Sequence, residues 1–200
     1  MKLTFVRPLF CFFAAASLHS PAVAQEPAAP HDPAVHAGAG LKKELIAGIT
    51  EADFLKLGAG PKTAKITLVA AFTDANYGMN FNGYSHGKAT YTIPVGWTVE
   101  VTFINPSPVP HSALVVERDM TKKVQLGEPA FKGAAVPNPI VGMSTSKATF
   151  TFVASEAGDY ALACGFPTHA AGGHWVALDV SPSAKAPSLK LGDAPEKEAK

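Results

Sequence analysis

Short apolar runs separated by turn residues fill the middle of the chain. Seven of these runs are rich in β-branched and aromatic residues, and clusters of Gly and Pro stand between them. No helical pattern alternates with the runs, as it would in a protein built of βαβ units. The pattern therefore predicts an all-β fold, an antiparallel β-sandwich. The expected strands cover residues 65–72, 89–95, 97–104, 111–117, 148–154, 159–164 and 174–180.

A different periodicity precedes the strands. Residues 41–57 carry apolar side chains at roughly helical spacing, and Gly48 interrupts the pattern. We expect two short helices here. Thr50 is the expected N-cap of the second helix, because the acidic residues Glu51 and Asp53 follow it.

The N-terminus has the features of an export signal. Lys2 and Arg7 give a positive start, residues 9–18 are apolar, and small residues lead to a cleavage site near Ala24. The apolar stretch is too short for a membrane-spanning helix, so we expect a periplasmic or secreted protein without a transmembrane segment in the mature chain. The expected divisions are a signal peptide at 1–24, a flexible leader at 25–40, a helical extension at 41–60, a main domain at 61–182 with an irregular stretch or short helix within 117–147, and a flexible C-terminal tail at 183–200.

The charge of the mature chain is close to zero. Removal of Lys2 and Arg7 lowers the number of basic residues from 17 to 15, against 16 acidic residues. This balance gives no basis for binding nucleic acid or an anionic membrane surface. The sequence also has no Gly-rich phosphate loop after a strand and no evident Ser/His/Asp arrangement. We expect a monomer.

One short loop gathers a cysteine and two histidines. Cys164, His169 and His174 lie in "YALACGFPTHAAGGHWVALDV", with four residues in each gap. The chain has two cysteines, and Cys11 leaves with the expected signal peptide. A bound metal protects a lone thiol in an oxidising compartment. A thiolate with imidazoles suits copper or zinc.

A fourth ligand has to come from another part of the chain. His111 is the best candidate, because in "FINPSPVPHSALVV" it begins a strand after a rigid Pro-rich loop. A sandwich allows that end of the strand to meet the loop that carries the cysteine. On ligand chemistry, copper and a structural Cys/His3 zinc site both remain open.

The segments "NPSPVPHS" and "ACGFPTHAAGGHW" resemble the cupredoxins, the blue-copper electron carriers, and are most similar to the sulfocyanin and rusticyanin branch. The segment "NFNGYSHGKATYTIPVGWTVEVTF" is also similar to sulfocyanin, so the resemblance covers about residues 65–181. It implies a cupredoxin-like Greek-key sandwich with one mononuclear copper ion. It further implies that His111, Cys164 and His169 are the equatorial ligands, and that the backbone N–H of Ser112 donates to the ligand sulfur.

The chain departs from the family pattern at the axial position. The family has a methionine five residues after the second histidine ligand, where this chain has His174. Imidazole is a stronger and harder donor than a thioether, so it should draw copper out of the trigonal plane and lower its potential. We therefore expect His174 as axial ligand and a green or red site. Met143 is the alternative axial ligand, whereas we expect Met79, Met120 and His86 to be core, loop or turn residues.

The resemblance implies a carrier of single electrons between redox proteins, not an enzyme. His169 is then the partly exposed edge through which electrons leave. Two alternatives within copper chemistry remain: a copper-binding protein for tolerance or delivery, and a red-copper-type site with a catalytic role. The expected apolar docking patch consists of Phe166, Pro167, Ala170, Ala171 and the loop 106–110.

Overall fold

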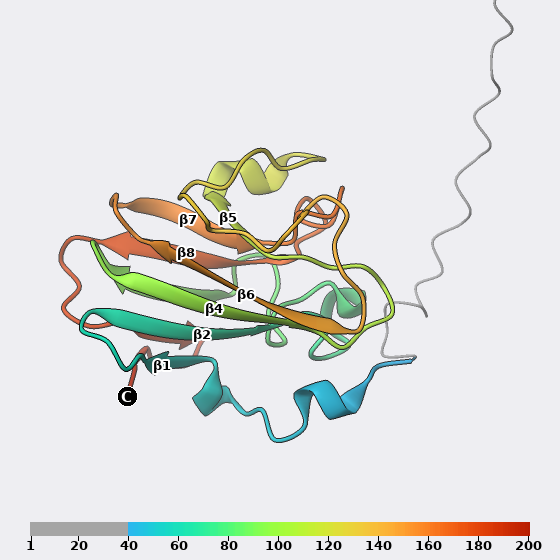
Figure 1. Cartoon of the computed structure of the whole chain (residues 1–200), viewed down its shortest axis with the longest axis horizontal. Helices are drawn as coiled ribbons and strands as arrows, with labels where there is room; N and C mark the ends of the chain where they lie inside the picture. Colours follow the sequence, from blue (N-terminus) through green and yellow to red (C-terminus); the bar gives the residue numbers. More distant parts are fainter. Residues whose placement is uncertain (1–39) are drawn as a thin grey trace, which may run out of the picture. The chain divides into compact units, whose positions relative to one another are not determined.

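Two β-sheets enclose an apolar core in the part of the chain that the structure describes, residues 40–200 (Figure 1). The structure is a computed structural model. The expected signal peptide at 1–24 and the expected leader up to residue 39 lie outside the described residues.

The first sheet has four strands and the second has six. The first is ordered β1 (Leu55–Leu57), β2 (Thr63–Val69), β4 (Thr98–Asn105) and β6 (Ser146–Val153). The second is ordered β10 (Lys197–Glu198), β9 (Ser188–Leu191), β3 (Ala89–Pro94), β8 (Trp175–Ser181), β7 (Gly158–Ala163) and β5 (Leu114–Glu117). The described helical segments are short 3-10 turns: η1 (Lys43–Ile46), η2 (Glu51–Asp53), η3 (Ala75–Gly78) and η4 (Arg118–Lys122).

Side chains along β4 alternate between the core and the outside, whereas β5 and β7 are buried on both faces. In β4, Val99, Val101 and Phe103 are buried, and the residues between them are half-buried. From the other sheet, Tyr91 and Ile93 of β3 enter the same core. Burying one such large apolar side chain stabilises the fold by about 1.5–3 kcal/mol. A slip of one residue would turn this set toward solvent, so the core fixes the strand register.

The expected β-sandwich is confirmed, but its expected antiparallel pairing is only partly right. All seven expected strands are present. The largest shifts are at 111–117, where the strand begins at Leu114, and at 65–72, where it ends at Val69. However, β2 runs parallel to β4, and β3 runs parallel to β8. The reason for the first pair is that β3, which lies in the other sheet, comes between β2 and β4 along the chain. The chain crosses over and returns, so β4 runs in the same direction as β2.

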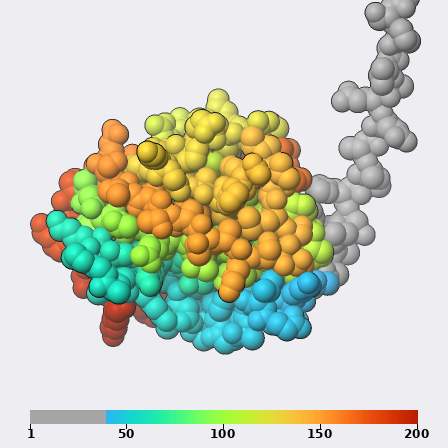
Figure 2. All heavy atoms as spheres, in the orientation of Figure 1, coloured from blue at the N-terminus to red at the C-terminus, as the bar shows by residue number. Residues whose placement is uncertain are grey.

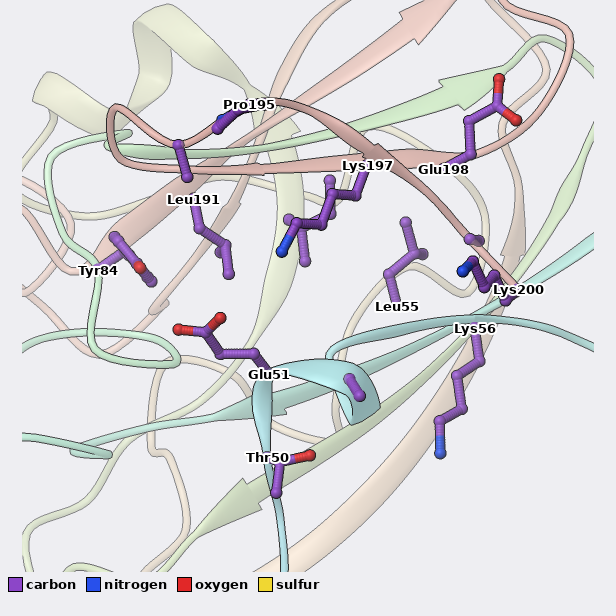
Figure 3. A pocket seen from close by; sticks show the side chains of 14 residues that line it. Thr50, Glu51, Leu55, Lys56, Tyr84, Leu191, Pro195, Lys197, Glu198 and Lys200 are labelled. Atoms are coloured by element: carbon purple, nitrogen blue, oxygen red, sulfur yellow. The ribbon is translucent and has the colours of Figure 1, made fainter.

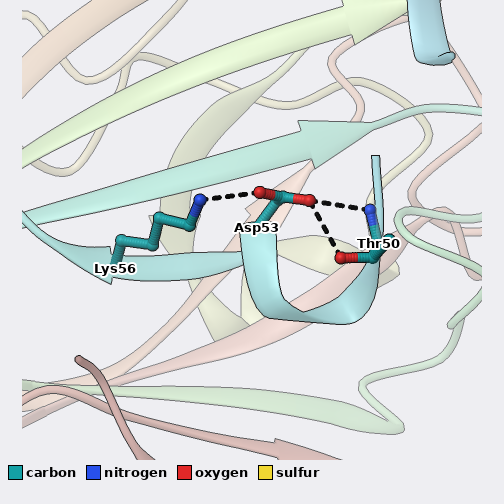
Figure 4. Close-up of polar contacts among 3 residues, drawn as sticks. All are labelled: Thr50, Asp53 and Lys56. Carbon is teal, nitrogen blue, oxygen red and sulfur yellow. Dashed lines mark hydrogen bonds and ion pairs between the residues drawn. The ribbon is translucent and has the colours of Figure 1, made fainter. Parts of the chain in front are cut away.

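The N-terminal segment contains two short helical turns, as expected, and Thr50 is the N-cap of η2. The backbone N–H and hydroxyl of Thr50 donate to the Asp53 carboxylate at 2.8 and 3.0 Å, and Lys56 Nζ donates to it at 2.7 Å (Figure 4). The hydrogen bond from Lys56, followed by those from Thr50, lowers the pKa of Asp53 to about 2. These contacts join η2 to the strand that follows it.

The expected helical pattern does not continue to residue 57. Leu55–Leu57 form β1 instead, and Leu55 pairs with Ile66 on the edge of the first sheet. Burial of Leu55 against the core outweighs the weak local preference for a helix. Figure 2 shows this N-terminal part of the described chain, in blue, along one edge of the sandwich.

The expectation of a flexible tail at 183–200 is wrong for residues 188–191 and 197–198, which form strands. β9 pairs antiparallel with β3, and β10 pairs with β9. Leu189 is only 8% exposed and joins the core, whereas Lys190 points outward. The charges and prolines around this strand hide a short period-two pattern in the sequence.

The long connection between β5 and β6 contains η4, which confirms a short helix in this stretch. Among the residues described, no helix is long and apolar enough to cross a membrane.

Candidate metal centre

Four buried side chains converge at one end of the sandwich. His111, Cys164, His169 and His174 each offer one donor atom, and these atoms all lie within 4.8 Å of one another. The four residues are between 0 and 2% exposed. The structure therefore brings together all the residues that the sequence predicts as ligands.

His111 is held by the loop before β5 and by a neighbouring turn. Its backbone N–H donates to the Met143 carbonyl at 3.1 Å, and its carbonyl accepts from the Met143 N–H at 2.8 Å. The buried Asn105 amide donates to the carbonyls of Val109 and Met143 at 2.8 and 2.6 Å. These bonds fix the Pro-rich loop against the turn, so the position of His111 is set before any metal binds.

The other three donors belong to one loop between β7 and β8. Its two ends are joined by a hydrogen bond from the Cys164 N–H to the His174 carbonyl, at 3.0 Å. Within the loop, the His174 N–H donates to the His169 carbonyl at 2.9 Å, and the His169 N–H donates to the Phe166 carbonyl at 3.1 Å. The backbone itself thus orients the three donors toward one point.

The spacing of the donor atoms fits a single metal ion. The Nδ1 atoms of His111 and His169 are 3.3 Å apart, and Cys164 Sγ lies 3.5 Å from His169 Nδ1. Two ligand atoms on one zinc-sized ion, with bonds of about 2.0–2.3 Å, are separated by about 3.3–3.6 Å. Together with the borderline-soft character of the Cys and His donors, this spacing fits copper or zinc.

The Cys164 thiol is buried, and hydrogen-bond donors lie close to its sulfur. Burial raises its pKa to about 11, although the backbone N–H groups of Ser112 and Phe166 act in the opposite direction. The Ser112 N–H points at Sγ from 3.4 Å, as the family resemblance implies. The Ser112 hydroxyl donates to the Pro139 carbonyl at 2.6 Å and accepts from the Gly165 N–H at 2.8 Å. Because a metal binds the thiolate, binding has to release this proton.

His174 lies inside the cluster, not on the surface. Its ring centroid is 4.7 Å from that of His111 and 5.9 Å from that of His169. The alternative axial residue, Met143, joins the cluster through its backbone contact with His111, while its side chain packs against the core. His86 has a positive φ of 54° in a turn, as expected, and is absent from the donor group found among the described residues.

The expected exposed edge at His169 is wrong, and part of the expected docking patch is buried, although Ala171 is exposed and Phe166 and Pro167 are half-buried. His169 is 2% exposed, and the Phe166 ring lies over it with a centroid distance of 4.7 Å. Ala170 is also 2% exposed, so it belongs to the core and not to the surface. Sequence reasoning missed Phe81, which packs on His174; the asparagines on both sides of it in "NFNG" are the only local signal.

The structure also contains a cavity of about 1150 Å³ that includes none of the four clustered residues. Figure 3 shows it between η2 and the C-terminal strands, with Glu51 and Lys197 directed toward it.

Comparison with known proteins identifies the family to which this fold belongs. A model of the sulfocyanin (SoxE) domain matches residues 51–189. The chain is 35% identical to sulfocyanin from Sulfolobus acidocaldarius over 137 residues, which are 63% of this chain and 67% of that protein. The two-sheet fold with its buried Cys/His cluster is that of a cupredoxin. Within this class, the chain belongs to the sulfocyanin family.

Solved structures similar to this chain include two kinds of copper protein. Auracyanin from Roseiflexus castenholzii is 21% identical with a TM-score of 0.40, and the match covers 62% of this chain and 100% of that one. Rusticyanin from Thiobacillus ferrooxidans is 21% identical with a TM-score of 0.35, over 65% of this chain and 89% of that one.

Proposed function

We propose that this protein carries single electrons between redox partners, using one copper ion bound by His111, Cys164, His169 and His174. The observation that carries the proposal is the convergence of these four buried donors within 4.8 Å in a sulfocyanin-family chain. When bound, copper supplies a one-electron couple between Cu(II) and Cu(I). The chain's part is to hold the donors in one arrangement for both oxidation states, through the backbone bonds around His111 and within the loop.

The burial of the site favours electron transfer over catalysis. All four donors come from the protein and are at most 2% exposed, whereas a catalytic metal site keeps a position open for water or substrate. His174 would add a third imidazole to a copper ion held here, and imidazole favours Cu(II) more than a thioether does. We therefore infer a lower potential than that of a methionine-ligated site.

The surface near the cluster supports docking of a redox protein through apolar contacts. Val124 is 67% exposed, and its carbonyl accepts from the N–H of Thr168, the residue before His169. Val141 is 68% exposed in the turn that pairs with His111. Small apolar interfaces suit brief encounters between redox proteins. We infer that these valines, with the half-buried Phe166, form part of the contact surface.

The proposal includes export and a monomeric state. The signal-like segment 1–24 supports export, and N-terminal sequencing of the periplasmic or secreted protein should begin near Gln25. Recovery of the uncleaved chain from the cytoplasm would contradict the proposed export.

The first test loads the mature protein with Cu(II) and records its visible and EPR spectra beside those of His174→Met. We expect intense thiolate-to-copper absorption in both, a green or red wild type, and a shift toward blue in the variant. Cys164→Ser is the control and should lose the absorption. A colourless wild type would overturn the copper proposal in favour of zinc or a plain core thiol, and identical spectra would remove His174 from the ligand set.

Voltammetry of the copper-loaded protein then distinguishes an electron carrier from a copper-handling protein. Fast, reversible one-electron exchange is expected of a carrier. Slow or irreversible exchange would instead support a copper-handling protein.

A further inference from the structure

The ring of Phe81 packs directly on the ring of His174. The two centroids are 4.3 Å apart and the planes are inclined by 45°. Phe81 is fully buried and also meets Phe103 of β4 edge-on, with centroids 6.3 Å apart and planes at 84°. The imidazole of His174 therefore packs on a ring that is itself held by aromatic contact in the core.

Two buried asparagines fix the backbone on either side of Phe81. The Asn80 amide donates to the carbonyls of Thr73 and Ala75 at 2.8 and 2.7 Å. These bonds tie the residue before Phe81 to the loop that leads into η3. Asn80 is completely buried, so a shift of this backbone would leave its amide without partners in a dry environment.

Asn82 provides the second anchor, on the sheet side. Its amide donates to the Thr67 carbonyl at 2.8 Å and to the Tyr91 hydroxyl at 2.9 Å, and its Oδ1 accepts from the Val69 N–H at 2.7 Å. Asn82 is 4% exposed. Both strands that it contacts belong to the core of the sandwich, so Phe81 has little freedom to move away from His174.

The same loop also contacts the backbone just before His174. The His86 N–H donates to the Gly173 carbonyl at 2.7 Å. The His86 ring lies so close to Gly173 that a Cβ at this glycine would be 2.3 Å from it. The segment 80–86 thus holds His174 in two ways. The Phe81 ring packs on the His174 imidazole, and the His86 N–H binds the carbonyl of Gly173, the residue before His174.

We propose that Phe81 is a positioning residue for His174. This inference rests on the proposed copper function: the Phe81 ring sets how His174 is presented to the metal, and so would tune how strongly His174 binds it. If His174 bound more weakly, copper would be held mainly by the other three donors. Phe81 is thereby a determinant of the colour and potential of the site without touching the metal.

The test compares copper-loaded Phe81→Leu with Phe152→Leu, a control at another buried phenylalanine that packs on Phe131, away from the cluster. We expect Phe81→Leu to change the ratio of the two thiolate-to-copper absorption bands, the copper hyperfine splitting and the reduction potential. Phe152→Leu should lower the melting temperature but leave all three unchanged. Equal spectra and potentials in both variants and wild type would overturn the inference.

A double-mutant cycle tests whether Phe81 acts through His174. In a His174→Gly background, adding Phe81→Leu should leave the spectrum unchanged, because the ring that Phe81 positions is gone. A shift of the same size in both backgrounds would mean that Phe81 acts through the general packing of the site, which would overturn the inference.

Two further outcomes keep the inference distinct from the proposed function. A colourless wild type would overturn both, whereas a coloured wild type that does not respond to Phe81→Leu would overturn the inference alone. If Phe81→Leu does not fold, Phe103→Leu is the second variant, because it removes the aromatic contact that Phe103 makes with the Phe81 ring. It should then produce a smaller change of the same sign, and an unchanged spectrum would overturn the inference.

Discussion

The first and last donors of the metal loop are joined to each other through their backbones. The Cys164 N–H donates to the His174 carbonyl at 3.0 Å, where β7 ends and β8 begins. The strand pairing that builds the second sheet, with Ala163 opposite Trp175, thus also sets the separation of these two donors. Changes to the loop backbone should therefore disturb the site more than equal changes elsewhere.

Gly173 provides a test of that loop. Its φ is 94°, and a Cβ there would lie 2.3 Å from the His86 ring, so Gly173→Ala combines backbone strain with a steric overlap. Gly96→Ala is the matched control, because Gly96 has a φ of 82° and open space around it. We expect the control to lose about 1–2 kcal/mol from left-handed strain alone. In Gly173→Ala the exposed His86 ring also has to move, so we expect a loss at least as large in urea unfolding, together with weaker copper absorption; unchanged absorption would contradict this packing.

The pH dependence of the metal-free protein follows from the buried thiol. Burial raises the pKa of Cys164 to about 11, from 9.0 for an ordinary thiol. The Cys164 thiol therefore ionises at a lower pH in the unfolded chain than in the folded protein. Its protonated form contributes fully to the free energy of unfolding below pH 9, and this contribution is lost as the pH rises toward 11. The loss is about 3 kcal/mol at most, on the scale of 1.36 kcal/mol per pKa unit.

Urea unfolding of metal-free wild type and Cys164→Ala between pH 8 and 11 measures this effect. The stability difference between the two proteins should shrink over that range, while the contribution of buried tyrosines cancels. A constant difference would show that the thiol does not titrate differently in the folded protein.

The C-terminal strand gives a third prediction. Leu189 is 8% exposed against the core, whereas its neighbour Lys190 is exposed on the same strand. We expect Leu189→Ala to cost about 2 kcal/mol of unfolding free energy, near the lower end for a buried leucine because β9 is short. Lys190→Ala should change stability by less than about 0.5 kcal/mol. If both variants unfold like wild type, residues 183–200 form a loose tail after all.

The strands and most of the donor set could be predicted from the sequence. Runs of apolar, β-branched and aromatic residues between Gly and Pro clusters mark the seven main strands, because such side chains pack well in a sheet. Cys164, His169 and His174 could be recognised because a single loop carries all three, and a loop keeps near neighbours in sequence close in space. His111 could be selected from its position at the start of a strand after the Pro-rich loop, and the resemblance to cupredoxins implies the same residue.

How these parts meet depends on long-range packing. The parallel pairing of β2 with β4 depends on where β3 lies, which local periodicity does not encode. β9 forms because β3 has an edge to pair with, despite the charged residues around Leu189. The contact of Phe81 with His174 joins residues more than ninety positions apart, and it exists only because packing of the whole core brings them together. Local sequence patterns report which side chains are buried, whereas long-range packing determines which buried side chains touch.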